Sequence, residues 1–132
     1  MSERWTEFQG GPNRSGRDEA RVTLNGRGVL LMNKTAFEAL GSPAAVKLSY
    51  EEDRRVIGLK PHDTRKANAF PVKQRDKYSN RSVHLSPFCR HFGIDIRRTV
   101  LFNEIDIDRE GMMRLELNRT QTIGRAGQNR EQ

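Results

Sequence analysis

Three side chains that could bind a metal or act as a nucleophile lie close together in the sequence: His84, Cys89 and His91. Cys89 and His91 are two residues apart on a predicted short helix, so their side chains point about 200° away from each other. A zinc site would also need a further ligand and usually shows paired ligand spacing. We therefore interpret these residues as two surface histidines and a half-buried cysteine, and we predict no metal site.

An acidic segment offers a second candidate, because Asp106, Asp108 and Glu110 precede Gly111 in the manner of a calcium-binding loop. Such a loop needs a bidentate glutamate at its twelfth position, and that position is Leu117. Apolar strand patterns also flank the segment on both sides. The segment is therefore typical of a polar hairpin turn.

The remaining catalytic patterns are weaker. Gly26 and Gly28 could belong to a phosphate-binding loop, but neither a Lys-Ser/Thr pair nor a long helix follows them. No Ser–His–Asp or Cys–His arrangement has a supporting context in the chain. We therefore predict no catalytic centre and no cofactor.

Binding of a polyanion is the chemistry that the composition favours. The 132 residues carry a formal net charge of +7, and the densest excess lies in residues 62–82, with six basic and two acidic side chains. These cations could face phosphates. Alternatively, they belong to a solvated linker and a strand edge, where positive charge discourages edge pairing. The basic side chains are Arg65, Lys66, Lys73, Arg75, Lys77 and Arg81.

The compartment is predicted from what the sequence lacks. A single cysteine cannot form an internal disulfide, and no apolar run approaches the roughly 18 residues that span a bilayer. The polar N-terminal segment does not have the pattern of a signal peptide. These features predict a cytoplasmic protein that does not contact a membrane.

Hydrophobic periodicity predicts a mainly β chain with short helices, organised as two ββαββ units. In the first unit, Val22 and Leu24 lie on one face of a strand, and a short helix runs from an N-cap at Asn33 to Gly41. The predicted segments are a flexible arm at 1–19, a first unit at 20–61, a linker at 62–68, a second unit at 69–118 and a disordered basic tail at 119–132.

The second unit repeats this order. Pro71 confines its first strand to a sheet edge or a bulge. Ser86 is the predicted N-cap of a helix that has Pro87 at its first position and ends at Gly93. One long strand is predicted over residues 99–107, followed by the hairpin turn and a last strand.

Superposing Gly41 on Gly93 gives an offset of 93 − 41 = 52 residues between the two units. Each helix is followed by a hairpin of similar length, which favours a true repeat. The alternative is a chance similarity between two common β–α–β–β cycles. Neither unit has enough apolar surface to fold alone, so we expect both to share one barrel-like sheet.

This layout resembles the AbrB-type swapped-hairpin family of transition-state regulators and antitoxins. The matching segments are RVTLNGRGVLLMNKTAFEALG with AAVKLSYEEDRRVIGLKP, and NRSVHLSPFCRHFGI with TVLFNEIDIDREGMMRLELN. In that family two chains intertwine into one barrel. The resemblance implies that one chain here supplies both halves, as a monomeric pseudo-dimer or within a homodimer.

The resemblance also implies binding of double-stranded DNA and a role in transcription regulation. Arg81 matches the arginine that follows the family's turn, and Arg90 matches a basic helix position, whereas Val29 stands at the arginine position of the first copy. The residues expected to contact phosphates are Lys73, Arg75, Lys77, Arg81 and Arg90, with smaller contributions from Arg27 and Lys34.

A protein-interaction module is the alternative function, as an antitoxin-like or accessory factor. In that case the arms at 1–19 and 119–132 would fold onto a protein partner. An enzyme on a barrel scaffold is the least favoured class, because no convergent set of polar residues is evident.

Overall fold

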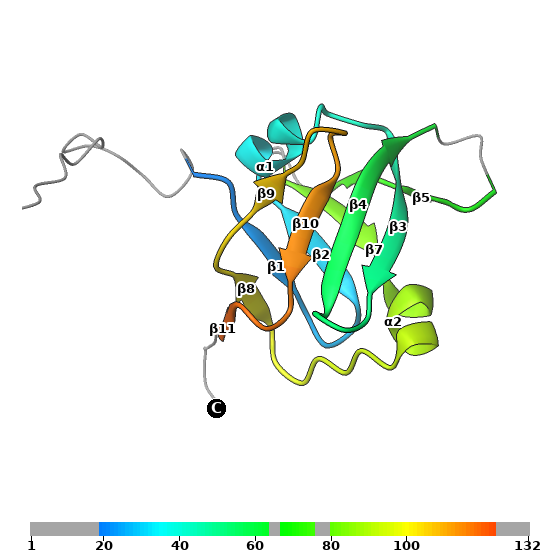
Figure 1. Cartoon of the computed structure of the whole chain (residues 1–132). Coiled ribbons are helices and arrows are strands. Elements are labelled where there is room, and N and C mark those ends of the chain that lie inside the picture. The colour runs from blue at the N-terminus through cyan, green and yellow to red at the C-terminus, as the bar shows by residue number, and fades with distance from the viewer. Residues whose placement is uncertain (1–18, 64–66, 76–79, 124–132) are drawn as a thin grey trace, which may run out of the picture.

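The computed structural model describes residues 19–63, 67–75 and 80–123, and it contains two antiparallel β-sheets and two short helices (Figure 1). The prediction of a mainly β chain with short helices is confirmed. Sheet A has the strand order β11 (Thr120–Thr122), β8 (Val100–Phe102), β1 (Val22–Leu24), β2 (Val29–Met32), β7 (Arg81–His84) and β6 (Lys73–Gln74). Sheet B has the strand order β5 (Ala69–Pro71), β3 (Ala45–Glu51), β4 (Val56–His62), β10 (Met113–Glu116) and β9 (Asp106–Ile107). Neither helix of the described residues has the length and apolar character needed to cross a membrane.

The first helix, α1 (Lys34–Ala39), begins and ends as predicted. The Asn33 side chain accepts a hydrogen bond from the backbone N–H of Ala36 at 2.9 Å, which satisfies one of the free amides of the first turn. Gly41 follows the helix with a φ of 95°, a left-handed conformation that glycine adopts without steric cost.

The second helix, α2 (Ser86–Phe92), ends at the predicted Gly93, but the prediction for its start is wrong. Leu85 is the N-cap, and Ser86 is already helical, so Pro87 takes the second position. The Ser86 hydroxyl does not cap the helix because it donates to the carbonyl oxygen of Arg27 at 2.6 Å. A contact between the two halves therefore replaces the local cap.

Two predicted strands are each divided between the sheets. The strand predicted around Pro71 becomes β5 at an edge of sheet B and β6 at an edge of sheet A, with Val72 between them. The long strand predicted over 99–107 becomes β8 in sheet A and β9 in sheet B. The hydrophobic pattern continues through such bends, because the side chains on both sides of a bend face the same core.

The predicted disordered tail is wrong in its first residues. Thr120–Thr122 form β11, which pairs antiparallel with β8 and is followed by a hydrogen bond from the Ile123 N–H to the Thr99 carbonyl oxygen at 2.9 Å. The sequence there is polar because β11 is an edge strand with largely exposed side chains. Residues 124–132 lie outside the described residues.

Two truncations test the role of β11. Ending the chain after Asn118 is expected to lower the free energy of unfolding by about 1–2 kcal/mol relative to ending it after Ile123. The shorter chain loses the ladder to β8 and uncovers Phe102, which is only 3% exposed. Chemical denaturation of both proteins measures the difference, and equal midpoints would contradict a structural role for β11.

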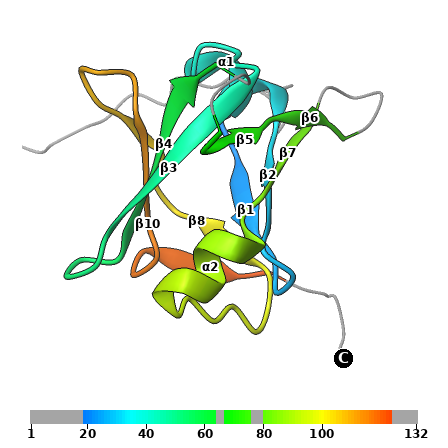
Figure 2. The ribbon, with the colours of Figure 1, turned by 90° about the vertical axis from the view of Figure 1, so that its right-hand side faces the viewer.

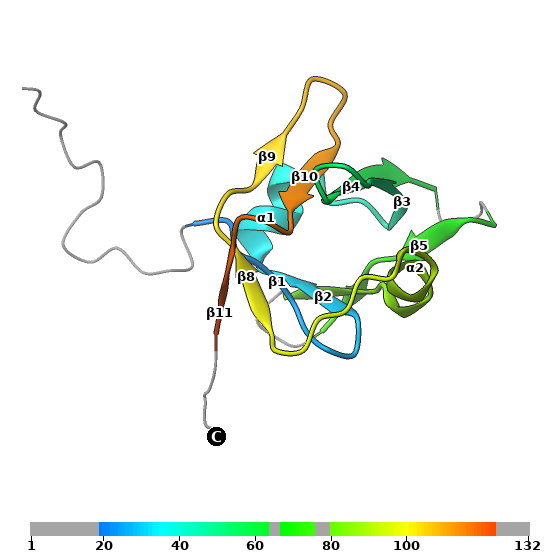
Figure 3. The same ribbon diagram turned by 60° about the horizontal axis from the view of Figure 1, so that its bottom comes forward.

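The core lies between the inner faces of the two sheets, and its strands surround it in the view of Figure 3. Alternation along each strand places apolar side chains inward, as predicted for Val22 and Leu24, which are fully buried. Leu40, at the end of α1, and Phe88, in α2, pack against this core and are buried.

Ladders between the two halves of the chain hold the core together. In sheet A, β2 pairs with β7 and β1 pairs with β8. In sheet B, β4 pairs with β10 and β3 pairs with β5. Residues before position 63 and residues after position 67 therefore share both sheets.

Candidate nucleic-acid interface

The ladder between β2 and β7 determines where the predicted DNA contacts lie. It pairs Val29 with His84 at one end and Met32 with Arg81 at the other. Because α1 follows Met32 and α2 follows His84, the two helices lie at opposite ends of the fold (Figures 1 and 2). The predicted contacts are consequently divided between an α1 end and an α2 end.

Four of the predicted contacts lie at the α1 end. Lys34 is the first residue of α1, and Arg81 stands opposite Met32 on β7. The neighbouring strand β6 begins with Lys73, and the Arg75 N–H donates to the Asn80 carbonyl oxygen at 2.7 Å as the chain leaves this strand.

Arg21 also belongs to this end, although the sequence analysis did not select it. Its backbone N–H donates to the side chain of Asn33 at 3.0 Å, directly before α1. The signal in the sequence was the position of Arg21 immediately before the first strand, whose antiparallel partner leads into the helix. We call Arg21, Lys34, Lys73, Arg75 and Arg81 the α1-end cluster.

Three members of the α1-end cluster have no ion-pair partner among the described residues, and Glu38 is the carboxylate of α1. Lys34, Lys73 and Arg75 are exposed, and none of the three forms an ion pair with another described residue. Such cations keep their full attraction for an external anion, whereas an arginine paired with a carboxylate must first lose that partner.

Arg81 is held more firmly than the other members. Its guanidinium lies 4.5 Å from the centroid of the Phe37 ring, and the side chain is half-buried. This cation–π contact orients the guanidinium and leaves its charge unneutralised. Its Nη1 is buried and has no hydrogen-bond partner among the described residues. Arg81 is therefore the least accessible of the predicted contacts that the structure describes.

The structure does not bring the other predicted contacts into this cluster. Arg27 lies in the turn between β1 and β2, and Arg90 lies in the last turn of α2, both exposed at the α2 end. At that end Asp95 pairs with Arg97 at 3.3 Å. Lys77 lies outside the described residues.

The structure also places the residues that were considered as metal ligands or as a nucleophile. Cys89 is buried in α2, and desolvation by this burial raises the pKa of its thiol. His84 and His91 are exposed. No group of three metal-binding side chains occurs in residues 19–63, 67–75 and 80–123. The Asp108 carboxylate accepts hydrogen bonds from the amides of Glu110 and Met112, which confirms the predicted hairpin turn.

A second group of cations was missed by the sequence analysis. Lys47 and Lys60 stand directly opposite each other on β3 and β4, and His62 follows on the same face. The signal was the hairpin itself, but it depends on the exact turn. Glu51 pairs with Val56, so the turn covers residues 52–55 and paired positions add up to 107, as 47 + 60 does.

No protein-family model, curated protein or solved structure matches this chain. Its function is therefore inferred from the fold and from the side chains described above.

Proposed function

We propose that the protein binds double-stranded DNA through the α1-end cluster, as a transcriptional regulator. The observation that supports this best is the grouping of exposed, unpaired cations around one end of the β2–β7 ladder. A cluster of this kind neutralises backbone phosphates and displaces their counterions, which supplies affinity without reading the base sequence.

We also propose that the chain is a tandem swapped-hairpin barrel of AbrB type. The midpoints of the paired segments 29–32 and 81–84 are 30.5 and 82.5, a difference of 52 residues. The helix starts, Lys34 and Ser86, also differ by 86 − 34 = 52. The left-handed glycines, Gly41 and Gly93, keep the same offset. This agreement supports two equivalent halves related by an axis through the β2–β7 ladder.

The repeat makes DNA binding asymmetric. Under the offset of 52 residues, the position of Arg81 in the second half corresponds to Val29 in the first. The α1 end therefore has a fixed arginine between exposed lysines, and the α2 end has no counterpart for it. A single DNA duplex is expected to contact the α1 end, whereas a symmetric dimer would present both ends equally.

Removing three unpaired cations is expected to weaken DNA binding and its dependence on salt. The variant Lys34→Ala/Lys73→Ala/Arg75→Ala should lower the slope of log K against log[salt] by about 2–3, because each lost phosphate contact contributes about 0.9. Affinity at low salt should fall roughly tenfold or more. Fluorescence anisotropy with a labelled random duplex at several NaCl concentrations measures both quantities.

A charge-matched variant provides the control. Arg54→Ala/Arg97→Ala/Arg119→Ala removes the same number of positive charges, and each of these arginines pairs with a carboxylate, from Glu51, Asp95 and Glu104 respectively. Its salt slope should stay within about 1 of the unmodified protein. Equal losses in the two triple variants would mean that net charge, and not the α1-end cluster, governs binding.

A further inference from the structure

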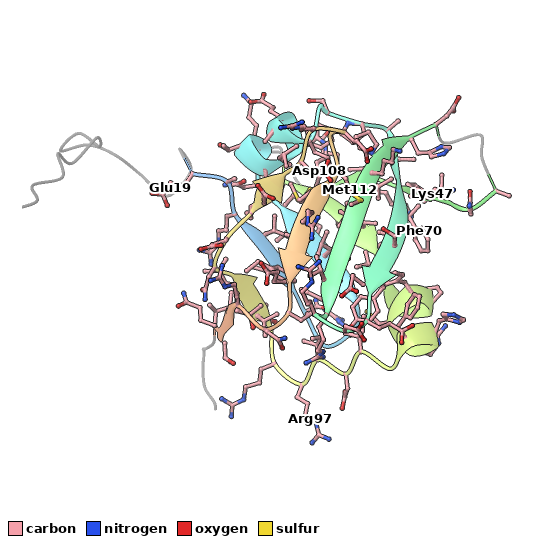
Figure 4. The ribbon with its side chains drawn as sticks, in the orientation of Figure 1. Glu19, Lys47, Phe70, Arg97, Asp108 and Met112 are labelled. Carbon is pink, nitrogen blue, oxygen red and sulfur yellow. The ribbon has the colours of Figure 1, made fainter. Side chains whose placement is uncertain are left out.

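A pocket of about 300 Å³ lies on sheet B, and none of its lining residues belongs to the α1-end cluster. Its walls come from two adjacent strands and from the turn between β9 and β10 (Figure 4). The lining residues are Lys47, Leu48, Ser49, Lys60, His62 and Met112.

Two lysines face each other across this pocket. The register of β3 and β4 places Lys47 directly opposite Lys60, so their Cβ atoms are roughly 4.5–5.5 Å apart on one face of the sheet. Both are exposed, and neither forms an ion pair with a described residue. Directly opposed like charges destabilise a sheet, so an anion between the two would remove a repulsion as well as add two attractions.

His62 supplies a third donor. It lies two residues after Lys60 on β4 and therefore on the same face. Its Nδ1 accepts a hydrogen bond from the Asp63 backbone N–H at 2.9 Å, so in the neutral ring the proton is on Nε2. A neutral His62 consequently still offers an N–H to a ligand in the pocket.

The apolar wall depends on a glycine in the middle of sheet B. A Cβ at Gly58 would lie 2.7 Å from the Met112 sulfur and 2.8 Å from the Ser49 hydroxyl oxygen. The absence of a side chain there lets Met112 lie over β4, where its sulfur is 3.8 Å from Ser49 Oγ. Glycine weakens the interior of a strand and often marks a close approach of other atoms, as it does here.

Neither lysine is neutralised by an ion pair with a described residue. On the same face of β3, the next carboxylate is Glu51, and it already contacts Arg54 at 3.9 Å. On β10, Arg114 stands opposite Asp106 of β9, so this pair adds little net charge. Lys47 and Lys60 are therefore the pocket cations without an ion pair to a described residue, and the Asp108 carboxylate beside the pocket accepts the Met112 N–H at 3.0 Å.

We propose that this pocket, the sheet B pocket, binds a phosphoryl group. Its oxygens accept hydrogen bonds from Lys47, Lys60 and His62, and Met112 covers the less polar side of the ligand. A phosphoryl group suits the site because it accepts several charge-assisted hydrogen bonds at once. The site shares no residue with the α1-end cluster, and a phosphoryl ligand held there goes beyond the contact proposed between that cluster and DNA.

Nuclear magnetic resonance titration with inorganic phosphate tests this proposal, with NaCl adjusted to constant ionic strength. Saturable shifts are expected at the backbone amides of residues 46–49, 59–60 and 112, with a dissociation constant in the millimolar range for an exposed site. Lys47→Gln and Lys60→Gln should each weaken binding by about tenfold, the effect of losing one charged hydrogen bond. Lys34→Gln is the matched control and should leave the phosphate affinity unchanged.

A second titration separates two sources of the phosphoryl group. Dimethyl phosphate, a singly charged diester, imitates the DNA backbone, whereas inorganic phosphate imitates a terminal phosphate monoester. Stronger binding of inorganic phosphate indicates a small phosphorylated ligand, and equal binding indicates a backbone phosphate. Shifts that do not saturate, or that NaCl reproduces at equal ionic strength, would overturn the proposal.

Thermal unfolding gives an independent readout of the lysine repulsion. Without phosphate, Lys60→Gln should unfold at the same temperature or about 2 °C higher, because an unfavourable pair is removed. Phosphate should raise the unfolding temperature of the unmodified protein more than that of the variant, which binds it about tenfold more weakly. A clear loss of stability in phosphate-free Lys60→Gln would contradict the repulsion on which the site depends.

Failure of phosphate binding leaves the salt dependence of DNA binding unaffected, so the two proposals can fail separately.

Discussion

Separating the chain into residues 1–66 and 67–132 is expected to leave neither polypeptide folded. Each half should show a random-coil circular dichroism spectrum and no cooperative unfolding transition, whereas the intact chain should unfold in one transition. The reason lies in the ladders, since β2 and β4 of the first half obtain their outer partners, β7 and β10, from the second half.

The buried side chains show how much stabilising free energy each half would lose on separation. Leu30 stands opposite Val83, and Leu59 stands opposite Met113, with all four fully buried. Removing the partner strands would expose these side chains to water, at a cost of about 1.5–3 kcal/mol for each one that becomes fully exposed. A typical domain has only about 5–15 kcal/mol of stability, so a few such losses unfold it.

Mixing the two halves is the informative control. Equimolar halves should regain the spectrum of the intact chain, with a transition that depends on concentration, because folding then requires association. A cooperative transition in either isolated half would show that the unit is an independent domain, which would contradict the shared core.

The local features of the fold could be predicted because each depends on a few adjacent residues. Asn33 caps α1 through its own side chain, and Gly41 and Gly93 adopt the left-handed conformation that ends each helix. Strand alternation likewise identified the buried face of β1, where Val22 and Leu24 are fully buried. These signals require no knowledge of the rest of the chain.

The wrong predictions all involve partners distant in sequence. Ser86 bonds to Arg27, which is 59 residues away, and a local capping rule has no means of detecting that acceptor. The polar strand β11 is ordered by the edge of β8, and its own composition resembles a tail. The division of residues 99–107 between two sheets follows from the shape of the whole core.

The candidate site could be predicted only in part, because some of its residues are adjacent in sequence and others are brought together by strand pairing. The basic segment that includes Lys73, Arg75 and Arg81 is visible in the composition, and its members remain neighbours in the fold. Arg21 and Lys34 join them only through the antiparallel pairing of β1, β2 and β7. The opposed lysines of the sheet B pocket likewise depend on the register of one hairpin.

Replacing Gly28 with alanine is expected to lower the free energy of unfolding by about 3 kcal/mol, which corresponds to a fall of roughly 15 °C in Tm. Gly28 has a φ of 81°, a conformation that costs other residues about 1–2 kcal/mol. A Cβ there would also lie 2.9 Å from the backbone N and Cα of Ser86. Backbone atoms at the start of a helix cannot rotate away, so the turn and α2 would have to separate.

The variant Gly41→Ala separates the conformational cost of a positive φ from the steric cost of the added Cβ. Gly41 has a φ of 95°, but a Cβ there would meet no atom within 4 Å, so this variant pays only the conformational cost of about 1 kcal/mol. Urea denaturation of both variants measures the difference. Because the carbonyl of Gly28 also accepts the Leu85 N–H at 2.6 Å, the excess loss in Gly28→Ala reports on the contact by which the first half positions α2. Similar losses in the two variants would mean that the turn between β1 and β2 does not press against α2, and that the close contact between the halves lies elsewhere in the fold.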